Sequence, residues 1–176
     1  MSDKSEGLSA DQYTIAEHHW KTTDGFHNLY VQEWGNLEGT PILFLHGGPG
    51  SGCHDGHKLL FDPHTHYVIF HDQRGCGHST PANSLKENNT QKLVEDIHMI
   101  VEKLSLNSFA IFGRSWGSTL GLCYTIDYPE RVASLIIGGV FLGTQEEADW
   151  VDKGQFDTFF PETSELADTA NPSSRD

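Results

Sequence analysis

Strand-forming segments follow one another along the first 140 residues. Residues 13–22 and 26–34 read as two strands separated by Asp24-Gly25, a pair that favours a tight hairpin turn. Further segments are hydrophobic throughout, which is typical of strands buried on both faces of a sheet. They are residues 41–45, 67–70, 109–112 and 132–140. The pattern therefore predicts a hairpin followed by buried strands.

Helical segments lie between and after these strands. Residues 89–104 carry hydrophobic side chains at helical spacing on one face and mostly charged side chains on the other. The hydrophobic positions are Leu93, Ile97, Ile100 and Leu104. A further helix is expected over residues 118–128, where Pro129 stops it, and the acidic, aromatic segment 146–160 is also expected to be helical.

The succession of strand, loop, helix and strand predicts an α/β fold. We expect a doubly wound, mainly parallel sheet that begins with an antiparallel hairpin. After Gly143 the signals for strands end. We therefore assign residues 1–143 to the sheet-forming core and residues 144–176 to a separate region whose end is loosely ordered.

The composition narrows the possible functions. With 25 acidic residues against 11 basic ones the formal net charge is −14, which disfavours nucleic acid and anionic membranes as partners. Scattered cysteines and a polar start without a secretory pattern favour a reducing, cytoplasmic location. The longest uncharged apolar stretch, residues 132–143, is too short to span a bilayer.

A candidate nucleophile lies between the predicted strand 109–112 and the helix that follows it. Residues 113–117 read Gly-Arg-Ser-Trp-Gly and match the Gly-x-Ser-x-Gly nucleophile elbow, with Ser115 at its centre. A serine on a sharp strand-to-helix turn needs small residues two positions before and after it. Its hydroxyl then faces the helix N-terminus, where free backbone N–H groups favour developing negative charge.

A glycine-rich loop after an earlier strand is the candidate for the oxyanion hole. Acyl transfer needs N–H donors that are already in place, each worth about 3–4 kcal/mol of barrier. In this type of fold one donor is the residue after the nucleophile, here Trp116, and the other comes from the loop His46–Gly50. Pro49 has no N–H, so Gly48 is the preferred donor, and Gly47 is the alternative donor and a candidate substrate contact. A phosphate-binding loop is disfavoured because no Gly-Lys-Ser/Thr follows.

Three motifs together resemble the prolyl iminopeptidase (proline aminopeptidase) family. They are His-Gly-Gly-Pro-Gly at 46–50, Asp-Gln-Arg-Gly-Cys-Gly-His-Ser at 72–79, and Gly-Arg-Ser-Trp-Gly-Ser-Thr-Leu at 113–120. The similarity extends from about residue 13 to about residue 162. It implies an α/β-hydrolase core, incomplete at the C-terminus, with a cap that begins in 144–176. It also implies a serine peptidase that removes N-terminal proline from peptides without a metal or cofactor.

The sequence departs from the family's pattern in two ways. Arg114 stands where the family usually has glycine, at a position that the elbow motif leaves free. All 11 histidines occur at or before His98, whereas the triad of this fold places its acid and then its histidine after the serine. The chain therefore reads as a truncated N-terminal half. We expect it to be close to inert alone, because loss of one triad member removes most of the rate enhancement.

Other interpretations stay open. Ser115 as an ordinary helix N-cap is disfavoured, because two companion motifs agree with the elbow. A non-catalytic binding or regulatory remnant is motivated by the missing histidine and the acidic tail. A hydrolase of another amide or ester is also possible, because specificity resides mostly in the cap. The sequence does not fix the oligomeric state.

The remaining histidines and charged residues are expected to serve the structure. The histidines between positions 54 and 71 should lie on the surface or in loops, because no set of them closes with zinc-ligand spacing. His46 should orient the glycine-rich loop. Asp72, Arg74 and His78 should pin the loops by hydrogen bonds. Cys76, in the motif at residues 72–79, and Cys123 should be small buried residues that contribute to packing.

Overall fold

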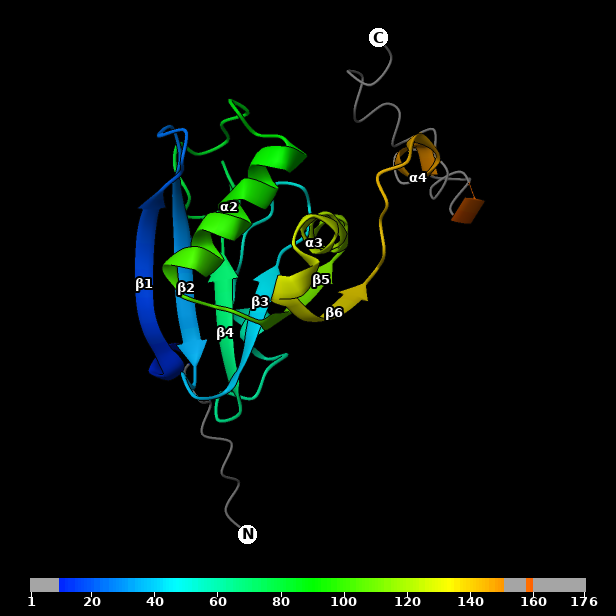
Figure 1. Ribbon diagram of the computed structural model, residues 1–176. Coiled ribbons are helices and arrows are strands. Elements are labelled where there is room, and N and C mark those ends of the chain that lie inside the picture. Colours follow the sequence, from blue (N-terminus) through cyan, green and yellow to red (C-terminus); the bar gives the residue numbers. More distant parts are fainter. Residues whose placement is uncertain (1–9, 151–157, 160–176) are drawn as a thin grey trace. The chain divides into compact units, whose positions relative to one another are not determined.

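The computed structural model describes residues 10–150 and 158–159. It divides into two compact units, Met1–Val140 and Phe141–Asp176. The first unit is a six-stranded sheet with the strand order β1-β2-β4-β3-β5-β6 (Figure 1). The strands are β1 (Thr14–Lys21), β2 (Asn28–Gly35), β3 (Thr40–Leu45), β4 (His66–His71), β5 (Phe109–Arg114) and β6 (Val132–Gly138).

The two longer helices of the first unit were predicted, at residues 89–104 and 118–128, whereas the three short ones were not. The α-helices are α1 (Asp55–Lys58), α2 (Thr90–Lys103) and α3 (Trp116–Asp127), and the short 3-10 helices are η1 (Ala10–Tyr13) and η2 (Pro129–Arg131). Strand β4 pairs antiparallel with β2 and parallel with β3, while β3, β5 and β6 are parallel to one another. The expected α/β architecture, a largely parallel sheet that begins with an antiparallel hairpin, is confirmed.

The hairpin forms around the turn that the sequence indicated. The N–H of Gly25 donates to the carbonyl of Thr22 at 2.8 Å, and Gly25 takes a positive φ of 72°. Strands β1 and β2 then pair antiparallel. In β1 half-buried residues alternate with exposed ones, so one face of this strand is partly covered while the other meets solvent.

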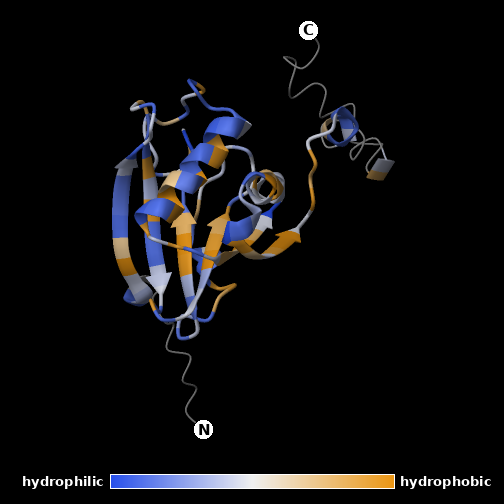
Figure 2. Cartoon of the chain, in the orientation of Figure 1, coloured by the Kyte–Doolittle hydropathy of each residue, from blue (hydrophilic) through white to orange (hydrophobic). Residues whose placement is uncertain are grey.

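Helix α2 begins and ends where the hydrophobic spacing predicted. Asn89 caps it, because its side-chain oxygen accepts the N–H of Lys92 at 3.0 Å. Leu93, Ile97 and Ile100 pack into the core that α2 and α3 form with one face of the sheet. Figure 2 shows hydrophobic residues concentrated in the central strands, whereas the outer side of α2 is mostly hydrophilic.

Strand β6 departs from the prediction. It was expected to be buried on both faces, yet its residues are only half-buried or exposed, and Ile136 is 50% exposed. The physical reason is its place at the end of the strand order, where β5 is its one neighbouring strand among the described residues. A continuous hydrophobic run therefore does not distinguish a central strand from an edge strand.

The second unit is described over residues 141–150 and 158–159. Helix α4 (Gln145–Asp149) begins with a capping box in which Thr144 and Glu147 bond each other's backbone N–H groups. Most of the helical segment expected at 146–160 lies outside the described residues, so the assignment of 144–176 to a cap stays a prediction. Within the described part of the chain, no helix is long and apolar enough to cross a membrane.

Candidate active site

Ser115 occupies a strained backbone position between β5 and α3. Its φ of 53° and ψ of −125° lie in a region that residues with a side chain rarely adopt. Its N–H donates to the carbonyl of Gly138 at 3.0 Å, and its own carbonyl accepts both the N–H and the hydroxyl of Ser118. The residue is exposed. The turn therefore presents the Ser115 hydroxyl at the carboxyl end of the sheet.

The two motif glycines are required by close backbone packing. A Cβ on Gly117 would overlap the carbonyl oxygen of Leu45, at the end of β3. A Cβ on Gly113 would likewise overlap the carbonyl of Gly117. The start of α3 therefore lies directly against β5 and the end of β3, as the elbow motif requires.

The glycine-rich loop after β3 faces the elbow. A Cβ built on Gly47 would lie 3.2 Å from the Cβ of Ser115 and 3.8 Å from its hydroxyl oxygen. Gly48 follows with a φ of 117°, which glycine adopts without strain. Trp116 is the first residue of α3, where the backbone N–H has no intrahelical acceptor. The structure thus brings Ser115, Gly47 and Trp116 together, with Gly48 next in the loop. Their roles as donors stay a prediction.

His46 orients this loop, as predicted. The side chain is fully buried, and Nδ1 lies 2.9 Å from the carbonyl oxygen of Gly47 while Nε2 accepts the N–H of Gln73 at 3.1 Å. Nδ1 also accepts the backbone N–H of Gly52 at 3.2 Å, so the ring bonds the backbone on both sides of the glycine-rich segment. Burial lowers the pKa of His46, and the opposing contributions of the Gly47 carbonyl and Asp72 are smaller. A neutral ring with both nitrogens engaged is a positioning group, not a base.

Gln73 connects the two halves of the candidate site, a role that sequence reasoning missed. Its side-chain amide donates to the carbonyl of His46 at 3.0 Å, and its side-chain oxygen accepts the indole N–H of Trp116 at 3.0 Å. Gln73 is 2% exposed. Its place two residues after the end of β4, within the Asp-Gln-Arg motif, was the available signal, but the partners of a side chain follow only from the assembled sheet.

The charged residues of the same motif pin loops, as expected. The Asp72 carboxylate accepts the N–H of Cys53 at 2.6 Å and the N–H of His78 at 2.7 Å. Arg74 is fully buried and donates from two nitrogens to Asp96 on α2. It also pairs with Asp24 in the hairpin turn.

Some side-chain expectations need correction. His71 was expected on the surface or in a loop, but it is 1% exposed because it ends the central strand β4. Cys76 is buried as predicted, whereas Cys123 is half-buried. Among residues 10–150 and 158–159, no group of three or more histidine, cysteine or acidic side chains is arranged to hold a metal ion.

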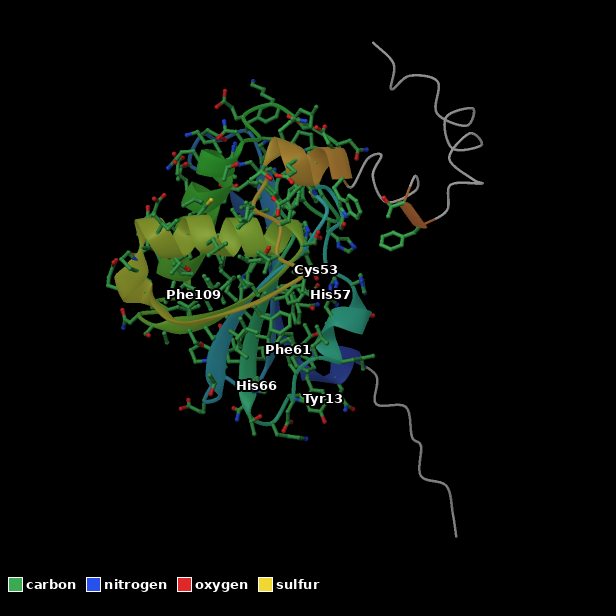
Figure 3. The ribbon with its side chains drawn as sticks, turned by 90° about the vertical axis from the view of Figure 1, so that its right-hand side faces the viewer. Tyr13, Cys53, His57, Phe61, His66 and Phe109 are labelled. Carbon is green, nitrogen blue, oxygen red and sulfur yellow. The ribbon has the colours of Figure 1, made fainter. Side chains whose placement is uncertain are left out.

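A surface hollow of about 290 Å³ opens beside Ser115. Its lining includes Ser115, Gly47, Arg114 and the two histidines of the α1 segment, His54 and His57. Figure 3 shows His57 on the side of the sheet where α1 lies, close to Cys53. Ser115, the glycine-rich loop and an open cavity therefore meet at one place.

A serine on a strained strand-to-helix turn, at the carboxyl end of a largely parallel sheet and facing a glycine-rich loop, defines the class of α/β proteins with a nucleophile elbow. The chain belongs to the family with the alpha/beta hydrolase fold, whose model matches residues 40–173.

Curated relatives confirm the resemblance to proline iminopeptidases. The chain is 41% identical to the proline iminopeptidase of Arabidopsis thaliana over 139 residues, which cover 79% of this chain and 37% of the relative. It is 41% identical to the proline iminopeptidase of Neisseria gonorrhoeae over 137 residues, which cover 77% of this chain and 44% of the relative. The chain thus spans less than half the length of these relatives.

Solved structures share the fold. The proline iminopeptidase of Mycobacterium smegmatis superposes with a TM-score of 0.65 at 24% identity, covering 90% of this chain and 55% of that one. A proline iminopeptidase-related protein of Thermus thermophilus superposes with a TM-score of 0.60 at 26% identity, covering 70% of this chain and 44% of that one.

Proposed function

We propose that this chain carries the nucleophile part of a serine aminopeptidase that releases N-terminal proline from peptides. The observation that supports the proposal most strongly is the strained, exposed Ser115 packed against the Gly47 loop. The names of the curated relatives supply the substrate class. Cys53, Cys76 and Cys123 are unpaired, which fits the proposed cytoplasmic location.

In the proposed reaction the Ser115 hydroxyl oxygen attacks the carbonyl carbon of the first peptide bond. The proton leaves to a general base, and the carbonyl oxygen becomes an oxyanion that accepts the N–H groups of Gly48 and Trp116. Collapse of this intermediate breaks the C–N bond, the leaving nitrogen takes up the proton held by the base, and the shortened peptide departs as an amine while a prolyl ester stays on Ser115. Water then hydrolyses the ester and frees proline. No metal or cofactor takes part in these steps.

The proposed reaction needs a general base, and in this fold the base is a histidine that follows the serine in the sequence. All 11 histidines lie at or before His98, and none follows Ser115. With nucleophile and oxyanion donors but no base, a serine hydrolase keeps only a small remainder of its rate. We therefore propose that the chain alone turns over poorly and that an added imidazole base restores activity.

Chemical rescue tests the proposal on the protein as it exists. Hydrolysis of prolyl-4-nitroanilide is followed while imidazole is added, and the uncatalysed rate with imidazole is subtracted. We expect a rate that rises with imidazole in the unsubstituted chain and does not rise in Ser115→Ala. Ser108→Ala is the matched control, because Ser108 is an exposed serine directly before β5, at the opposite end of that strand from Ser115, and its rate should rise with imidazole as in the unsubstituted chain.

The same assay separates the alternatives. An imidazole-dependent rate that is equal in the unsubstituted chain and in Ser115→Ala would contradict the proposal. Equal rates with prolyl and alanyl substrates, or a preference for a simple ester, would indicate another amide or ester hydrolase. Peptide binding with no Ser115-dependent turnover at any imidazole concentration would indicate a non-catalytic binding protein.

A further inference from the structure

The hollow beside Ser115 differs in charge from the rest of the molecule. The chain has 25 acidic residues and 11 basic ones, yet no carboxylate is among the described residues that line this hollow. Its charged or titratable lining residues are Arg114, His54 and His57. The local surface is therefore suited to an anion although the molecule as a whole repels one.

Arg114 supplies a fixed positive charge at this place. It ends β5 directly before Ser115, and it is exposed. Within the described part of the chain it forms no ion pair, whereas Arg74 and Arg131 both pair with carboxylates. A guanidinium presents several N–H groups in a planar fork that matches a carboxylate.

His57 supplies an N–H donor, and its geometry argues against a role as general base. Its Nδ1 accepts the backbone N–H of His54 at 3.2 Å, so the neutral ring carries its proton on Nε2. The ring is held between Phe44, at 4.6 Å, and His54, at 3.7 Å between ring centroids. Burial, together with the nearby His54, His46 and Arg114, lowers the pKa of His57 to about 4. The ring is therefore neutral at pH 7.

From these observations we infer that the hollow selects peptides that present a carboxylate close to the bond that Ser115 attacks. Arg114 pairs with this carboxylate, and the Nε2–H of His57 donates a hydrogen bond to it. The inference rests on the proposed function for the placement of the peptide beside Ser115. Two sources offer the same chemistry. One is the C-terminal carboxylate of a proline dipeptide, and the other is an acidic side chain directly after proline.

Binding measured by amide chemical-shift titration of the 176-residue chain tests the inference without turnover. The probes are prolyl-alanine, which has a terminal carboxylate, prolyl-glutamic acid α-amide, which has a side-chain carboxylate and an amidated terminus, and prolyl-alaninamide, which has no carboxylate. We expect at least one carboxylate probe to bind about tenfold more tightly than prolyl-alaninamide, as for a charge-assisted hydrogen-bonded pair. The shifts should centre on Ser115, Gly138 and Gly139. The tighter of the two carboxylate probes identifies the source.

Variants assign the selectivity to its residues. Arg114→Gln should reduce the ratio between carboxylate and amide probes to about one, whereas Lys21→Gln, which removes an equal charge from exposed β1, should leave the ratio unchanged. His57→Phe should lower the ratio, and His57→Gln, which keeps an N–H donor, should restore most of it. Equal affinities in the unsubstituted chain, no detectable binding, or a ratio that survives Arg114→Gln would overturn the inference. A failure of imidazole rescue with the ratio intact would instead count against the proposed function alone.

Discussion

Ser115 adopts an unfavourable backbone conformation because the residues around it leave no alternative. Gly113 and Gly117 allow β5, the end of β3 and the start of α3 to approach more closely than side chains would permit. The strain is held by bonds on both sides, from Ser115 to Gly138 and from Ser118 back to Ser115. At the residue scale, the elbow is therefore a property of backbone packing, and the serine side chain is what that packing exposes.

The first prediction concerns one of these glycines. Gly117→Ala places a Cβ against the carbonyl of Leu45, so we expect it to lower the free energy of unfolding by about 1–3 kcal/mol, as for other overpacked sites. Gly138→Ala is the matched control, because its Cβ would meet only the side chain of Arg114, at 4.0 Å. Urea unfolding measures both variants. Equal stabilities of the two would show that α3 does not lie against β3 as described.

The second prediction concerns Gln73. Gln73→Leu leaves the indole N–H of Trp116 and the carbonyl of His46 without their partner in a buried place, so unfolding should become easier by about 1–3 kcal/mol. Trp116 should also show an altered indole N–H resonance. Gln91→Leu, on the exposed side of α2, should leave both the stability and that resonance unchanged. An unshifted indole resonance in Gln73→Leu would remove Gln73 from its bridging role.

At the scale of elements, the sequence predicted what depends on local pattern. The hairpin at Asp24-Gly25 and the extent of α2 follow from the preferences and spacing of residues close in sequence, and both are confirmed. The prediction that β6 is buried on both faces was wrong, because burial depends on neighbours that are distant in sequence. The hollow beside Ser115 could not be predicted, since His57 and Arg114 lie more than 50 positions apart and meet only through the order of the strands.

The third prediction tests the link between α2 and the hairpin turn. Asp96→Ala leaves the fully buried Arg74 without its α2 partner, and breaking a buried pair costs about 3–5 kcal/mol. Glu95→Ala, one position away, removes a pair with Lys92 that is partly open to solvent, and such pairs contribute about 0–1 kcal/mol. Denaturant unfolding compares the two. A cost for Asp96→Ala as small as that for Glu95→Ala would contradict the described network.

At the scale of the whole molecule, buried neutral histidines tie stability to pH. Burial lowers the pKa of His46, of His57 to about 4 and of His71 to about 3, and the Nδ1 of His71 has no hydrogen-bond partner. Below about pH 6.5 the unfolded chain binds protons at these histidines while the folded chain does not. The stability that these neutral histidines contribute is therefore fully present above about pH 6.5, and it is lost as the pH falls toward 4.

The fourth prediction follows for His71. Because the folded-state pKa of His71 is about 3, this histidine contributes a slope of about 1.4 kcal/mol per pH unit between pH 6.5 and 4, so His71→Phe should make the decline of stability there shallower by about that amount. The measurement is the free energy of unfolding at a series of pH values. His19→Phe, a substitution of an exposed histidine on β1, is the matched comparison. An unchanged slope in His71→Phe would mean that this side chain is not buried in its neutral form.

A fluorophosphonate reacts with exposed nucleophilic serines. The site at which it modifies the folded chain therefore tests whether Ser115 is the exposed nucleophile of this fold. Peptide mapping by mass spectrometry after treatment in the presence of imidazole locates the adduct. We expect a single adduct on Ser115 that is lost in Ser115→Ala and on prior unfolding in urea. An adduct on another serine, or modification that is no faster in the folded chain than in the unfolded one, would contradict it.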